Sequence, residues 1–153
     1  MLAVEFYNAV VALHVMAIVI AFGVTFAYPI MGPYLGKNHP GALPAFHGVQ
    51  ERIGKFLITP FATFALITGI YLAADAEVFD EVFVQVPMVI LIVLLGMGGA
   101  FFAPLERRAL ELSANPESAE YQSIAAKIAK GGMVASVLIL VAIYFMVAKP
   151  FYP

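Results

Sequence analysis

The sequence predicts an all-α fold: a bundle of four transmembrane helices with the N-terminus and the C-terminus outside the cell. The composition, the spacing of the charges and the distribution of the cations all point to it. Hydrophobic residues make up 63% of the 153 residues and charged residues 12%, against about 45–50% and 25% in soluble domains. A chain this small cannot bury so much apolar surface away from water, so we expect that surface to face lipid.

Cysteine is absent from the sequence. This excludes disulfides, thiolate nucleophiles, iron–sulfur clusters and cysteine-bound zinc. The formal net charge is −2, and no stretch of lysines and arginines is dense enough to indicate nucleic-acid binding. The lipid bilayer is therefore the partner that the composition predicts.

Long stretches without Asp, Glu, Lys or Arg separate the charged blocks. They cover residues 6–36, 56–74, 82–105 and 131–148. A helix needs about 20 apolar residues to cross a bilayer, and the stretches lack the alternation of a transmembrane barrel. We place the spans in one membrane domain, 1–153, at about residues 6–31, 56–74, 83–104 and 131–148.

The cations indicate the orientation. The connection between spans one and two holds Lys37, Arg52 and Lys55, and the connection between spans three and four holds Arg107, Arg108, Lys127 and Lys130. The remaining connection carries only acids, so the positive-inside rule places the basic connections in the cytoplasm of a bacterium and the protein in its plasma membrane. Glu5 makes the leader acidic and the first apolar run is long, so we expect this helix to be retained rather than cleaved.

The connections carry turn and cap signals. Four prolines are expected to end the first helix and make the following segment irregular: Pro29, Pro33, Pro40 and Pro44. Residues 45–55 then form an extension into span two, where Thr59-Pro60 predicts a kink. Asn115 is the expected N-cap of an amphipathic segment, 116–130, that leads into span four.

Small residues at four-residue spacing predict where helices approach closely, because lipid supplies no hydrophobic force between them. Span three offers Gly96/Ala100 and Gly99/Ala103, and span four offers Gly132/Ser136. These pairs fit contacts within the bundle or the face of a homodimer. The sequence leaves both open.

His14 is the one readily ionisable side chain well inside a span, roughly 15 Å along the first helix. Small and polar residues follow it on the same face: Ala17, Ala21, Thr25 and Tyr28. We expect this face to point into the bundle, towards the small residues of helices three and four. Candidate partners at similar depth are Thr63, Thr68, Met97 and Ser136.

Two interpretations of His14 stay open. One is a structural hydrogen bond to a hydroxyl or carbonyl, worth about 0.6 kcal/mol on average. The other is functional, since intramembrane ionisable groups are candidates by default: an axial ligand of haem b iron, a quinone contact or a proton relay, with Thr25 and Tyr28 near the cofactor. His39 and His47 lie far from this depth, so the haem would have one histidine or be shared across a dimer. With Glu51 they offer fewer ligands than metal sites usually hold.

Short motifs carry a family resemblance. They are Ala12-Leu13-His14, the segment from Gly48 to Lys55, Thr68-Gly69-Ile70-Tyr71-Leu72 and the ending Met146-Val147-Ala148-Lys149-Pro150. With them the chain resembles an uncharacterised family of bacterial four-helix membrane proteins, a domain of unknown function. That family is distantly similar to the haem-containing four-helix membrane protoporphyrinogen oxidase and to copper-resistance membrane proteins.

The resemblance implies that His14 matches the first-helix histidine near the haem of the oxidase. It also implies that Pro29 matches a proline of that family. Ile30 stands where the oxidase has an arginine, and Leu35 where it has a second histidine. These departures speak against the oxidase activity and only mildly against haem.

The sequence alone ranks three functions. First comes an accessory or structural membrane subunit without a catalytic apparatus, alone, as a homodimer or within a larger complex. A haem- or quinone-binding redox protein using His14 follows closely. A small transporter or oligomeric channel comes last, because no inverted repeat or midplane charge is visible.

Overall fold

The computed structural model describes residues 2–152, and every regular element in that range is a helix. The elements in chain order are α1 (Leu2–Phe22), η1 (Gly23–Phe26), α2 (Tyr28–Asn38), η2 (Pro40–Ala42), α3 (Leu43–Ile53), η3 (Gly54–Ile58), α4 (Thr59–Asp75), α5 (Val82–Met97), η4 (Gly98–Phe102), α6 (Ala103–Leu112) and α7 (Ala119–Ala148). The turns η1 and η2 are 3-10 helices, whereas η3 and η4 are π-helical.

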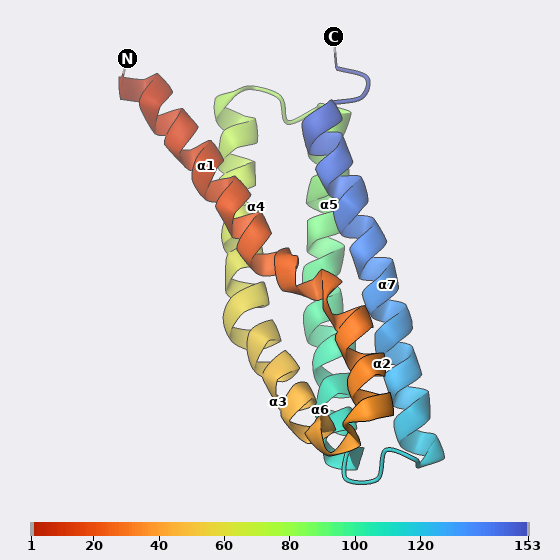
Figure 1. Ribbon diagram of the computed structural model, residues 1–153. Helices are drawn as coiled ribbons and strands as arrows, with labels where there is room; N and C mark the ends of the chain where they lie inside the picture. The colour runs from red at the N-terminus through yellow and green to blue at the C-terminus, as the bar shows by residue number, and fades with distance from the viewer. Residues whose placement is uncertain (1, 153) are drawn as a thin grey trace.

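These elements join into four long helical rods, each long and apolar enough to cross a membrane: Val4–Asn38, Pro40–Asp75, Val82–Leu112 and Ala119–Ala148. Figure 1 shows the rods running up and down in one bundle, with both chain ends at the same end of it. We call this the terminal end, which also carries the α4–α5 connection. The loop end carries the α2–α3 and α6–α7 connections. The predicted all-helical bundle, with four helices long and apolar enough to span a membrane, is confirmed.

Large apolar side chains cover the outside of all four rods. Val19, Ile67, Val93 and Val137 remain between 46% and 64% exposed, one on each rod. A surface of this kind is unfavourable in water and suits the hydrocarbon of a bilayer.

The centre of the bundle is built from small residues. Ala17 and Ala21 of α1 lie with Ala62 and Ala65 of α4 in one buried cluster, each at most 1% exposed. Alanines let two backbones approach closely, which is how helices gain contact in lipid. Leu91 and Ile139 complete the cluster. The buried face of α1 therefore packs chiefly against α4, the second rod, and the expectation that it faces mainly the third and fourth rods is wrong.

Two prolines explain the π-helical turns. Pro60 and Pro104 have no amide hydrogen, and in a regular helix their rings would collide with the carbonyl four residues back. In η3 the amide of Thr59 instead bonds the carbonyl of Gly54, and in η4 the amide of Ala103 bonds that of Gly98. The wider turn makes room for the ring. An irregularity at Thr59-Pro60 was expected from the sequence, while that at Pro104 was not.

The first rod bends at η1 and stays helical beyond it. Pro29 occupies the first turn of α2 and Pro33 lies inside that helix. Proline is tolerated in a first turn because the amide there has no helical partner. The prediction that the prolines end the helix is therefore wrong, since α2 runs on to Asn38. The bend takes the chain from contact with α4 to contact with α3 and α7 (Figure 1).

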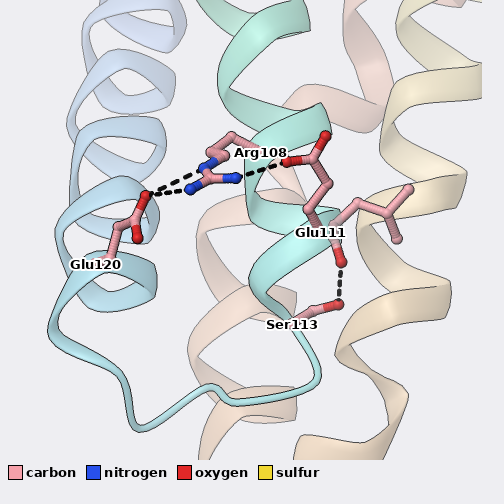
Figure 2. Close-up of polar contacts among 5 residues, drawn as sticks. Arg108, Glu111, Ser113 and Glu120 are labelled. Atoms are coloured by element: carbon pink, nitrogen blue, oxygen red, sulfur yellow. Dashed lines mark hydrogen bonds and ion pairs between the residues drawn. The ribbon is translucent and has the colours of Figure 1, made fainter.

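Ion pairs and helix-capping hydrogen bonds stabilise the helix ends at the loop end. Figure 2 shows the ion pairs of Arg108. Arg108 of α6 bonds Glu120 of α7 at 2.7 Å and Glu111 of its own helix at 2.8 Å. These pairs are exposed and screened by water, so they add little to stability. Ser118 caps α7 by accepting the amide of Tyr121. The N-cap is thus Ser118 rather than the predicted Asn115.

The close approaches between rods occur at glycines other than the predicted pairs. A Cβ on Gly96, Gly99 or Gly132 would meet nothing within 4 Å. A Cβ on Gly131 would collide with Cε1 of Phe101. The ring of Phe101, in the η4 turn, therefore packs directly against the backbone of α7 at Gly131.

Replacing Gly131 by alanine should destabilise the bundle by about 1–3 kcal/mol, because the added methyl group displaces the Phe101 ring and forces η4 away from α7. Thermal unfolding in detergent measures the loss. Gly132→Ala is the matched control, since its neighbouring position on the same helix is open. Equal stability of the two variants would contradict the packing described here.

Candidate functional site

His14 lies on the face of α1 that contacts α4. Its Nδ1 atom is 2.9 Å from the carbonyl oxygen of Ala65 and 3.1 Å from Oγ1 of Thr68. A carbonyl oxygen can only accept a hydrogen bond, so the geometry assigns the proton of the neutral ring to Nδ1. Thr68 in turn donates to the carbonyl of Phe64 at 2.9 Å. The imidazole is thereby fixed in one orientation.

Gly69 gives the ring its space. A Cβ at this position would lie 3.0 Å from Cε1 of His14. Across the described residues, Nε2 has no hydrogen-bond partner. The lone pair of this nitrogen is therefore available to a ligand.

Of the partners expected at this depth, Thr68 alone bonds His14. Thr63 is exposed and donates to the carbonyl of Thr59, and the buried hydroxyl of Ser136 has no partner in the described range. Thr25, a predicted neighbour of a cofactor, donates to the carbonyl of Phe22 at 2.6 Å. Among the described residues, none of these three groups hydrogen-bonds the imidazole.

Tyr28 also lies apart from His14. Its ring packs edge-on against Phe46 of α3, with 6.2 Å between the centroids. Because α2 continues the first rod beyond the bend, Tyr28 lies towards the loop end and belongs to a second polar centre.

That centre is a buried network joining three helices. Nδ1 of His47 on α3 donates to Oε2 of Glu106 on α6 at 2.8 Å, and Nε2 lies 2.9 Å from the hydroxyl of Tyr121 on α7. The three residues are 4%, 6% and 5% exposed. Both ring nitrogens are engaged, and the carboxylate has a donor. The network thus satisfies groups that would be costly to bury alone.

Two further buried polar atoms border the network without a partner in the described structure: the hydroxyl oxygen of Tyr28 and Oε1 of Gln50. Gln50 follows His47 by three residues, so the two side chains share a face of α3. An unpaired buried polar atom is unfavourable by about 1–3 kcal/mol.

Sequence reasoning missed this network because its members are distant in the chain. Glu106 is 59 residues from His47 and Tyr121 is 74. One signal was present: Glu106 is the first charged residue after the third apolar run. His39 and Glu51 are exposed, and within residues 2–152 no group of three His, Cys, Asp or Glu side chains can hold a metal ion.

Comparisons with protein-family models, curated proteins and solved structures find no match. The geometry of the two histidines therefore carries the functional interpretation. Ile30 is 74% exposed on α2. Leu35 packs against the apolar cluster at the loop end.

Replacing His47 by alanine should lower the free energy of unfolding by about 3–5 kcal/mol, because it leaves Glu106 buried without its donor. Denaturation in detergent, followed by circular dichroism, measures the loss. His39→Ala removes an exposed histidine and should leave stability within about 0.5 kcal/mol. A His47 variant as stable as this control would show that the network adds nothing to the fold.

Proposed function

We propose that this chain is a multi-pass membrane protein that binds a b-type haem through His14. The proposal rests on the different environments of the two ring nitrogens of His14. Nδ1 donates to the Ala65 carbonyl while Nε2 has no partner in the described structure. Histidines that ligate metals almost always donate their second nitrogen to a carbonyl or carboxylate in this way.

The chemistry of the surrounding residues fits this role. Thr68 and the Ala65 carbonyl hold the ring, and Gly69 leaves it room. Bound haem would supply a one-electron redox centre. His39 follows the end of α2 and His47 lies in α3, so His14 would be the single histidine ligand unless a second copy of the chain supplied another.

The proposal predicts a coloured protein. When the chain is expressed with ample haem, the purified protein should show a Soret band, because the free Nε2 ligates the iron. His14→Ala should abolish the band, and His39→Ala, which changes an exposed histidine, should keep it. A colourless wild-type protein, or a band that persists in His14→Ala, would rule the proposal out.

The second candidate is the accessory or structural membrane subunit that ranks first on sequence alone. The bond from His14 to Ala65 and the fit of the ring over Gly69 favour it, because they equally suit a packing role. It predicts a colourless protein that tolerates His14→Ala. The unpartnered Nε2 favours haem binding over this candidate, and a channel or transporter stays third.

We further propose that the loop end lies in the cytoplasm of a bacterium and the terminal end outside, because the lysines and arginines concentrate at the loop end. Without native cysteines, single cysteines can test this in whole cells. An impermeant maleimide should label Asp80→Cys directly and Glu117→Cys only after lysis. Both positions are exposed. The reverse labelling pattern would invert the proposed topology.

A further inference from the structure

The buried network at the loop end places a phenol, an imidazole and a carboxylate in one hydrogen-bonded line. The hydroxyl of Tyr121 lies 2.9 Å from Nε2 of His47, and Nδ1 of the same ring lies 2.8 Å from Oε2 of Glu106. All three residues are buried. The need to pair buried polar groups is met by many combinations of side chains, and it does not require these three in this order.

The order of the groups fixes the direction of the hydrogen bonds. An ionised carboxylate can only accept a hydrogen bond, so the geometry assigns the proton of the neutral imidazole to Nδ1 of His47. Nε2 then carries a lone pair, and the hydroxyl of Tyr121 donates to it. The phenol of Tyr121 therefore has a base in direct contact with its proton.

Tyrosine is the side chain of this protein that gives up a single electron most readily. Tryptophan and cysteine, which also do so, are absent from the sequence, whereas tyrosine occurs seven times. A phenol that loses an electron becomes strongly acidic, so the loss is easier where a base takes the proton at the same moment. The surroundings of each hydroxyl group thus decide where a one-electron oxidation of the chain ends.

Tyr121 differs from the other tyrosines in having such a base. Among the hydrogen bonds of the described residues, its hydroxyl group alone contacts an imidazole or a carboxylate. The hydroxyl of Tyr28 is buried without a partner in the same range, so the ring could lose an electron only with its proton retained. Tyr34 and Tyr144 are 56% and 58% exposed, with no base bonded to their hydroxyl groups in the described structure.

We propose that Tyr121 is a redox-active tyrosine, with His47 as the acceptor of its proton. One electron passes from the ring of Tyr121 to an outer-sphere one-electron oxidant, such as a high-valent metal complex, which is reduced by that electron. The O–H bond breaks, and the proton forms a new N–H bond at Nε2 of His47. The products are a neutral phenoxyl radical and an imidazolium, and an electron donor reverses the step.

Glu106 stabilises the imidazolium that the step creates. Its carboxylate lies 2.8 Å from Nδ1 of His47, in a buried site where water screens the attraction between opposite charges poorly. Arg108, on the same helix, is held at the surface by Glu111 and Glu120 and does not compete for this carboxylate. The negative charge of Glu106 therefore favours the oxidised state of Tyr121.

Burial protects the radical without preventing its formation. An electron tunnels through protein, whereas a proton moves only across a hydrogen bond, and that bond is present at Tyr121. The residue is 5% exposed, which keeps other molecules from reacting with the phenoxyl oxygen. The site lies on α3, α6 and α7, and His14 lies on α1, so the inference does not depend on the proposed haem.

Electron paramagnetic resonance tests the proposal on the purified protein in lipid nanodiscs. A ruthenium(III) tris-bipyridine complex, generated by a light flash with a cobalt(III) acceptor, oxidises the protein, and the sample is frozen. The wild-type protein should show a neutral tyrosyl radical, and Tyr121→Phe should lose most of it. Tyr28→Phe, which changes a buried tyrosine without a bonded base, should keep it. A wild-type protein without the radical, or a signal that persists in Tyr121→Phe, would overturn the proposal.

The wild-type radical also reports on His47. After the transfer, the Nε2–H group donates back to the phenoxyl oxygen, so pulsed measurements on protein with isotope-labelled histidine should detect a histidine nitrogen beside the radical. A radical without this nitrogen contradicts the proposal even where Tyr121→Phe does not fold. Glu106→Gln keeps an acceptor for Nδ1 and removes the charge that stabilises the imidazolium, so the radical yield should fall. An unchanged yield in the folded variant would contradict the role of Glu106.

Discussion

Proline inside a spanning helix is the constraint from which the other features of this fold follow. In hydrocarbon, backbone polar groups must find partners within the protein, yet proline offers no amide and its ring displaces a carbonyl. The chain meets this demand before Pro60 and Pro104 with π-helical turns, in which an amide bonds five residues back. At the first turn the hydroxyl of Thr59 also donates to the Gly54 carbonyl, at 2.8 Å. The Gly54 carbonyl thereby accepts two hydrogen bonds from Thr59.

The interruptions determine how the rods pack. Before the bend at η1, α1 lies against α4 through paired alanines at the centre of the bundle, and beyond the bend the same rod reaches α3 and α7. At the loop end, α3, α6 and α7 bring His47, Glu106 and Tyr121 into contact. The polar network is therefore buried where three helices meet.

The four spans could be predicted from sequence because composition and charge spacing are local properties. Thr68 was among the expected partners of His14 because depth can be counted along two straight helices. The network at His47 could not be predicted, since its three bonded side chains lie far apart in the sequence, on α3, α6 and α7. Gly131 illustrates the same limit. Its importance depends on Phe101, which reaches it only through the π-helical turn. The predicted pairs at Gly96 and Gly99 had the right spacing but face open space.

His14 and His47 show how the environment of the second ring nitrogen decides what a histidine can do. Each uses Nδ1 as a donor, to the Ala65 carbonyl in one case and to the Glu106 carboxylate in the other. A neutral carbonyl fixes the orientation of the His14 ring, whereas the buried carboxylate of Glu106 depends on His47 for its donor. Nε2 of His47 is engaged by Tyr121, which ties the imidazole to a third helix. Nε2 of His14 has no such partner in the described structure, so His14 is suited to hold a ligand and His47 to hold three helices together.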